Sequence, residues 1–231
     1  MWSDWMKKVV IVGIGRMGET LADKLRGKVS LFLYDVNHTK AKKIAQELNV
    51  QTADLNELAE MEIVILALPA GVMTKAVQEM KSYFKADVIL VNIATSCPQK
   101  AIVDAMGSGE QVVSAKFVGH AKEIKAGEIP TIVIDAPSEQ LGSVVADILA
   151  PIGKIIFASE DIVAKLNTLA AEEGIRAALR VKRKMIHLGL PEELFLPAVR
   201  GVAAGTMKAY AVGDAGPFVK ELAEKILAEI N

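Results

Sequence analysis

The chain lacks several features that mark special classes of protein. It has one cysteine, Cys97, so no disulfide can form within the chain, which favours a reducing compartment. Its 27 basic and 28 acidic residues give a net charge of -1, which provides no field to attract nucleic acid. The longest apolar run, Ile63 to Met73, is too short to cross a bilayer, and residues 1–8 contain no signal-peptide core. We therefore expect a cytoplasmic protein that binds neither nucleic acid nor a membrane.

Metal chemistry is also not indicated, because no His, Cys and Asp residues cluster at the spacing of metal ligands. What the chain does have is a hydrophobic composition of 52%, which is enough for a large buried core. This composition predicts a globular protein.

The most informative pattern is an apolar strand followed by a glycine-rich turn. Residues 9–12 read Val-Val-Ile-Val, and glycines follow at the G-x-G-x-x-G spacing. In dinucleotide-binding folds the first glycine permits a tight turn, the second lets the backbone approach a pyrophosphate, and the third lets the helix pack on the strand. The phosphates then face a helix N-terminus, whose N–H groups favour an anion. The residues expected to bind the cofactor here are Gly13, Ile14, Gly15, Arg16, Met17 and Gly18.

A carboxylate ends the second predicted strand. Asp35 follows Val29 to Tyr34 and lies 22 residues after Gly13, near the spacing at which a carboxylate binds the adenine ribose. Because a carboxylate would repel a 2′-phosphate, Asp35 favours NAD, while Lys40 leaves NADP open. We therefore expect NAD as the cofactor and NADP as the alternative.

Strand and helix patterns alternate through residues 1–158. This alternation predicts an α/β fold, a Rossmann doubly wound and mostly parallel sheet that binds NAD(P). A capping box led by Ser96, with Gln99 three residues later, is expected to start a helix that runs to about Met106, and a polar loop is expected from His120 to Glu128. Strands are expected at 9–12, 29–34, 50–53, 63–67, 88–91, 112–118, 131–134 and 154–157, and the other helices at 15–25, 39–48, 72–84 and 138–149.

Residues 159–231 show no strand-like alternation. Helices are expected at 161–188, 191–212 and 217–230, separated by segments that contain glycine and proline. Three helices make a thin all-α domain for substrate binding and dimerisation. Each helix could bury one face against a second copy of the chain, so we expect a homodimer through this region.

These motifs together resemble the superfamily of NAD(P)-dependent dehydrogenases in which an all-helical domain follows a Rossmann domain, the pyrroline-5-carboxylate reductase-like and 6-phosphogluconate dehydrogenase-like proteins. The likeness to pyrroline-5-carboxylate reductase lies in residues 13–18, 65–69, 189–194 and 205–208. It implies that Leu68 and Pro69 lie against the cofactor ribose. It also places the loop after the fifth strand near the nicotinamide, where Thr95 is the candidate for a polar contact.

The chain departs from the reductase in the second half. Where that family carries Ser-Gly-Ser-Gly-Pro-Ala-Tyr, residues 167–173 read Asn-Thr-Leu-Ala-Ala-Glu-Glu. Lys165 and Asn167 resemble the catalytic Lys and Asn of β-hydroxyacid dehydrogenases at a shorter spacing, and Phe117 to His120 resemble a segment of prephenate dehydrogenases.

We take His120, Lys165 and Asn167 as the candidate catalytic residues. His120 begins a polar loop after a strand, where it could donate a proton to a carbonyl or an imine. The alternatives are a surface histidine for His120, a solvated helix face for Lys165, and a backbone carbonyl in the dimer core as the partner of the Asn167 amide.

The sequence thus predicts an NAD(P)-dependent oxidoreductase that moves a hydride to or from a small imine or a keto or hydroxy metabolite. Two alternatives stay open. One is a prephenate- or arogenate-type dehydrogenase. The other is a catalytically silent dinucleotide-binding regulatory protein, which the missing Ser-Gly-Ser-Gly-Pro run suggests.

Overall fold

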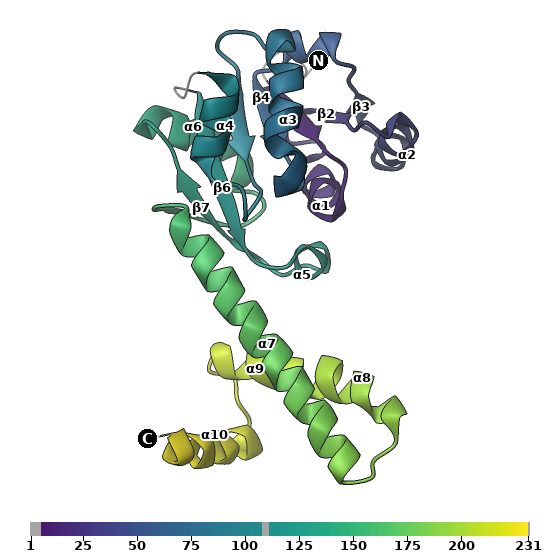
Figure 1. Ribbon diagram of the computed structural model, residues 1–231, viewed down its shortest axis with the longest axis vertical. Coiled ribbons are helices and arrows are strands. Elements are labelled where there is room, and N and C mark those ends of the chain that lie inside the picture. Colours follow the sequence, from purple (N-terminus) through teal and green to yellow (C-terminus); the bar gives the residue numbers. More distant parts are fainter. Residues whose placement is uncertain (1–5, 108–110, 231) are drawn as a thin grey trace. The chain divides into compact units, whose positions relative to one another are not determined.

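A computed structural model of the chain describes residues 6–107 and 111–230, so the expectation for the N-terminus falls mainly outside the described residues. The chain divides into two compact units between Asn167 and Thr168. The first unit contains an eight-stranded sheet with helices, and the second contains helices (Figure 1).

The elements of the first unit alternate along the chain as the sequence predicts. They are β1 (Lys8–Val12), α1 (Arg16–Leu25), β2 (Ser30–Tyr34), α2 (His38–Leu48), β3 (Gln51–Thr52), the 3-10 turn η1 (Asn56–Glu60), β4 (Ile63–Leu66), α3 (Ala70–Met80), the 3-10 turn η2 (Lys81–Tyr83), β5 (Ile89–Asn92), α4 (Gln99–Met106), β6 (Val112–Val118), α5 (Ala121–Lys125), β7 (Thr131–Asp135), α6 (Glu139–Leu149) and β8 (Lys154–Phe157). The long helix α7 (Asp161–His187) begins in this unit.

The strands lie in the order β3-β2-β1-β4-β5-β6-β7-β8. Every neighbouring pair is parallel except β6 and β7, which are antiparallel. The prediction of a doubly wound, mostly parallel sheet is therefore confirmed. The strand order reverses between β1 and β4, and such a switch point opens a crevice at the carboxyl ends of the strands, where ligands bind in this architecture.

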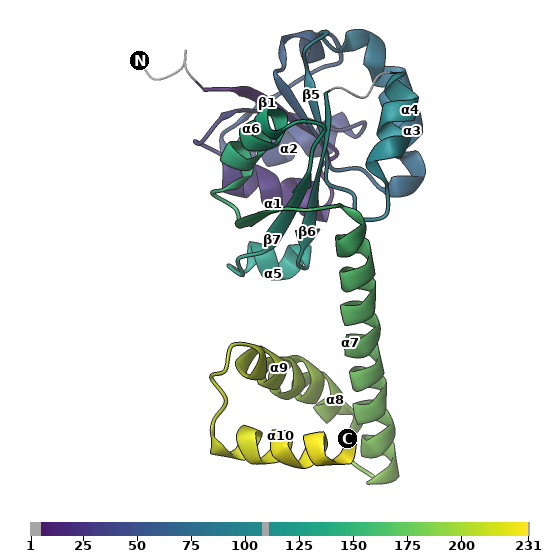
Figure 2. The same ribbon diagram turned by 90° about the vertical axis from the view of Figure 1, so that its left-hand side faces the viewer.

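Helices cover both faces of the sheet, which explains the unbroken apolar run in β1. Val9 and Ile11 pack into one buried cluster with α1, α2 and α6, while Val10 and Val12 pack into a second cluster with α3 and α4. Figure 2 shows α1 and α6 on one side of the sheet and α3 and α4 on the other. Burying each such side chain contributes roughly 1.5–3 kcal/mol, so β1 anchors both layers.

The start of α4 differs from the sequence-based prediction. The helix begins at Gln99 with Pro98 at the N-cap, and Ser96 is exposed outside it. The backbone N–H of Gln99 donates instead to Oε1 of Glu160 at 2.6 Å. The predicted capping box is wrong because a carboxylate that is remote in sequence supplies the acceptor that Ser96 was expected to provide.

The predicted polar loop after β6 also differs, because it contains the short helix α5. Its one apolar anchor, Ile124, is 1% exposed and packs in the core cluster beside α1. Lys125 forms an ion pair with Glu19 of α1. A single buried residue among polar neighbours produces no helical period, so tertiary packing rather than local pattern stabilises this helix.

The second unit continues α7 and adds helices where the sequence predicts them. A π-helical segment interrupts the stretch after Pro191. Within the described part of the chain, none of the helices is long and apolar enough to span a membrane. The elements are the 3-10 turn η3 (Glu192–Leu194), α8 (Phe195–Pro197), the π-helix η4 (Ala198–Ala203), α9 (Ala204–Ala211) and α10 (Pro217–Ile230).

The capping arrangement predicts different effects for two substitutions. Glu160→Ala should lower the free energy of unfolding by about 3–5 kcal/mol, because the N–H at the start of α4 loses a charged acceptor and the buried Lys116, whose Nζ lies 3.4 Å from Glu160, loses its counter-charge. Ser96→Ala, the matched control, should change it by less than about 0.5 kcal/mol. Urea denaturation of the two variants measures both values. A larger loss for Ser96→Ala than for Glu160→Ala would contradict the assignment of the cap to Glu160.

Candidate active site

The three glycines of the turn after β1 have different steric surroundings. Gly13 has φ +95°, a conformation that side chains disfavour, and a Cβ there would lie 2.8 Å from the carbonyl oxygen of Ala67. A Cβ on Gly18 would lie 2.0 Å from the carbonyl oxygen of Gly13, so only glycine lets α1 pack this closely. A Cβ on Gly15 would meet nothing within 4 Å, which leaves open space beside the N-terminus of α1.

Asp35 is tied to the same turn. Its Oδ2 accepts a hydrogen bond from the backbone N–H of Ile14 at 2.7 Å, and its Oδ1 accepts one from the N–H of Asn37 at 2.8 Å. Each oxygen keeps lone pairs for a further donor. The carboxylate is therefore held at the edge of the turn, in an orientation set by the backbone.

A hollow of about 620 Å³ lies at the carboxyl ends of β1, β2, β4 and β6. Two cations, Arg16 and Lys40, and the anion Asp35 lie along its wall. The open backbone at Gly15, the helix N-terminus and these cations suit a dinucleotide with its phosphates. The lining residues are Gly13, Gly15, Arg16, Met17, Asp35, Val36, Lys40, Ala67, Leu68, Pro69, Val72, Gly119, His120 and Ala121.

Most of the cofactor-binding residues expected from the sequence meet in this hollow. Ile14 is buried and contributes its N–H to Asp35, and Gly18 contributes the close packing of α1. Thr95 is half-buried in the loop after β5 and does not line the hollow as the structure describes it. The expected residues that do line it are Gly13, Gly15, Arg16, Met17, Asp35, Leu68 and Pro69.

The three candidate catalytic residues are not brought together. His120 is exposed and lines the hollow. Lys165 is exposed on α7, and neither it nor Asn167 belongs to the described lining. The side-chain N–H of Asn167 donates to the backbone carbonyl of Phe117 at 2.8 Å. The partner of this amide is thus a backbone carbonyl of the chain's own sheet, not one in a dimer core.

A buried lysine that the sequence analysis missed lies on β6. Lys116 is 1% exposed, and its Nζ donates to the carbonyl oxygens of Ala94 at 2.6 Å and Cys97 at 2.9 Å. Oε2 of Glu160 lies 3.4 Å from the same nitrogen. Burial lowers the pKa of Lys116, and the Glu160 carboxylate acts in the opposite direction. The sequence signal that could have identified this residue is a lysine inside an otherwise apolar strand.

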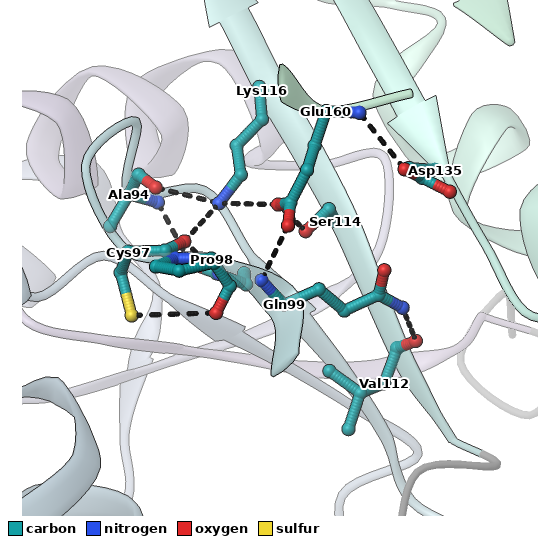
Figure 3. Close-up of polar contacts among 10 residues, drawn as sticks. Ala94, Cys97, Pro98, Gln99, Val112, Ser114, Lys116, Asp135 and Glu160 are labelled. Atoms are coloured by element: carbon teal, nitrogen blue, oxygen red, sulfur yellow. Dashed lines mark hydrogen bonds and ion pairs between the residues drawn. The ribbon is translucent and has the colours of Figure 1, made fainter. Parts of the chain in front are cut away.

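Glu160 connects this lysine to the rest of the sheet, as Figure 3 shows. Its side chain accepts hydrogen bonds from the hydroxyl of Ser114 and the N–H of Gln99, and its backbone N–H donates to Asp135 at 2.9 Å. Cys97 in the same network is 3% exposed, and burial raises the pKa of its thiol, which disfavours the thiolate that a nucleophile needs. Across the described residues, no three His, Cys, Asp or Glu side chains form a group that could hold a metal.

Comparison with known proteins shows which families the chain is similar to. The model of the protein family described as "NADP oxidoreductase coenzyme F420-dependent" matches residues 8–96. Over 180 residues the chain is 28% identical to the glycerol-3-phosphate dehydrogenase [NAD(P)+] of Clostridium perfringens, an alignment that covers 68% of this chain and 54% of the relative. The chain thus spans about half the length of that curated relative.

Solved structures share the fold at low sequence identity. A pyrroline-5-carboxylate reductase from Coxiella burnetii aligns over 96% of this chain and 85% of its own, with a TM-score of 0.72 and 15% identity. An imine reductase from Streptomyces aurantiacus aligns over 96% and 78%, with a TM-score of 0.68 and 19% identity. The family match over residues 8–96, the curated relative and the shared fold agree with the resemblance of the sequence to Rossmann-fold NAD(P)-dependent oxidoreductases.

Proposed function

We propose that this chain is an oxidoreductase that transfers a hydride between NAD(P)H and a carbon–nitrogen or carbon–oxygen double bond of a small metabolite. The observation that carries the proposal is the hollow in which the open backbone at Gly15 and the side chain of His120 lie together. The fold shared with structures named as pyrroline-5-carboxylate reductase and imine reductase favours an imine as the substrate.

The residues of the hollow have separable roles in this proposal. The bound cofactor would supply or accept the hydride. Arg16 and the N-terminus of α1 hold its pyrophosphate, and Asp35 accepts hydrogen bonds from the adenine ribose. His120 lines the hollow as the candidate proton donor to the substrate's nitrogen or oxygen atom. Asn167 acts indirectly, because its amide holds the start of α7 to the carbonyl of Phe117.

A catalytically silent nucleotide-binding protein is the second candidate. It is favoured by the positions of Lys165 and Asn167 outside the described lining of the hollow. Assays with NADH and NADPH against a panel of cyclic imines and keto acids, prephenate included, separate the two. Turnover of any of these compounds supports the enzyme, whereas cofactor binding without turnover across the panel supports the silent protein.

The two parts of the chain have different roles in the proposed enzyme. Residues 1–158 bind the cofactor, and the helices of residues 159–231 serve substrate binding and dimerisation. Among the described residues 168–229, Met185 has the only buried side chain. Ile175, Leu179 and Ile186 lie on one face of α7 and are 61%, 57% and 71% exposed.

A second copy of the chain is the partner that we propose for this unit. A further apolar hollow of about 310 Å³, which includes Met207, Tyr210 and Leu222, lies between α9 and α10. Helices with so little core of their own need apolar cover, and an identical chain supplies a matching apolar surface. The proposed assembly is therefore a homodimer through the C-terminal helices.

Binding of the cofactor should depend on the open space at Gly15. Gly15→Val should weaken binding of NADH and NADPH by about a hundredfold or more, because the new side chain would occupy the approach of the pyrophosphate. Thermal stability should stay close to that of the unaltered chain, since a Cβ at Gly15 meets nothing. Calorimetric titration measures the affinity. Gly71→Val is the control, because Gly71 also faces open space and is not part of the lining.

An unchanged affinity in Gly15→Val would show that the cofactor does not bind at this turn. Weak binding in both glycine variants would show that the loss is not specific to the hollow.

The charge of Asp35 should set the choice between the two cofactors. Asp35→Asn should raise affinity for NADPH relative to NADH by about tenfold, because the variant no longer repels a 2′-phosphate. Lys40→Ala should shift the ratio in the opposite direction, since Lys40 lines the same hollow. Titration with both cofactors gives the ratio. An unchanged ratio in Asp35→Asn would rule out contact between Asp35 and the ribose.

The dimer is tested by placing a charge on the apolar face of α7. Leu179→Glu should convert the dimer to a monomer, because burying an unpaired carboxylate is costly. Arg180→Glu, one position along the same helix, should leave the dimer intact. Light scattering after size-exclusion chromatography gives the molar mass. A monomeric unaltered chain, or a dimeric Leu179→Glu variant, would contradict the proposed interface.

A further inference from the structure

The loop after β5, residues 93–98, is held by side chains beneath it. Lys116 donates to the carbonyl oxygens of Ala94 and Cys97, at 2.6 and 2.9 Å. Asn92 adds two more bonds, because its amide donates to the Cys97 carbonyl at 2.8 Å and its Oδ1 accepts from the N–H of Ala94 at 3.1 Å. Both ends of the segment that contains Thr95 are therefore tied to the sheet.

The same loop lies next to the cofactor hollow by topology. β5 is between β4 and β6 in the sheet, and all three strands run parallel. The loops after β4 and β6 contribute Pro69 and His120 to the hollow. The loop after β5 emerges between them, at the same edge of the sheet.

A stability role alone does not account for a lysine at this place. Lys116 is almost completely buried, and its partner Glu160 is 13% exposed at the side chain. Replacement of a buried ion pair by apolar residues of similar volume is often neutral or stabilising. An apolar side chain at 116 would fill the space but would donate nothing to the carbonyls of Ala94 and Cys97.

We propose that Lys116 is a positioning residue, which fixes the loop of residues 93–98 so that Thr95 meets the nicotinamide end of the cofactor. This inference rests on the proposed function. The residue does not touch the cofactor in this arrangement. Its effect passes through the backbone carbonyls of Ala94 and Cys97.

The experiment compares the whole cofactor with a fragment that lacks the nicotinamide ring. NADH and ADP-ribose are titrated into the unaltered chain and into Lys116→Met by calorimetry; NADPH and 2′-phospho-ADP-ribose replace them if the chain prefers NADP. Lys116→Met should bind NADH about tenfold more weakly, and its affinity for ADP-ribose should stay within about twofold. Lys100→Met is the control, because Lys100 is exposed and pairs only with Asp104 in the interactions described.

The double variant Lys116→Met/Glu160→Gln tests the same role without leaving a buried charge that could disturb folding. It removes both charges together, so no buried carboxylate is left unpaired, and the amide oxygen that replaces the carboxylate can still accept from the N–H of Gln99. It should show the same difference between NADH and ADP-ribose.

Two kinds of failure are distinguishable. Equal weakening of NADH and ADP-ribose, or unchanged NADH affinity in a folded variant, would overturn the positioning role and leave the proposed function standing. Absence of NADH and NADPH binding to the unaltered chain would overturn the proposed function, and this inference with it.

Discussion

The close approach of α1 to the turn after β1 is the constraint on which the proposed nucleotide site depends. The space between Gly18 and the carbonyl of Gly13 holds no Cβ, so the helix can lie this close only with glycine at position 18. This contact sets where the N-terminus of α1 points. Asp35 then joins β2 to the same turn through the N–H of Ile14. Backbone contacts thus set the shape of the candidate site, and the side chains of Arg16, Lys40 and Asp35 supply its charges.

A largely buried carboxylate, that of Glu160, connects β6 with the helices α4 and α7. The carboxylate of Glu160 meets Lys116, the hydroxyl of Ser114 and the N–H that starts α4 (Figure 3). One side chain therefore connects the beginning of α7 to β6 and to α4. Breaking one partner of such a pair is costly, because the other charge is left in a poorly solvating interior. The arrangement specifies the position of the loop after β5 in a way that apolar packing would not.

The helical unit, unlike the sheet unit, has almost no buried core of its own. Its described side chains bury almost nothing on their own, and residues such as Val202, Val212 and Phe218 are 69%, 77% and 76% exposed. Apolar surface of this extent is unfavourable in water. The sheet unit carries its own core, whereas the helical unit leaves most of its described apolar side chains exposed.

Local pattern determined much of this protein. The run from Val9 to Val12 and the alternation after it predicted the sheet, and the spacing of Gly13, Gly15 and Gly18 predicted the tight turn at the candidate site. Periodicity and turn geometry are properties of neighbours in the chain, so the sequence records them. Tertiary structure decided the rest. The cap of α4, the helix around Ile124 and the partners of Asn167 and Lys116 all come from residues remote in sequence, so no local pattern records them. A buried polar group takes whichever partner folding brings to it, and only the folded chain shows which one that is.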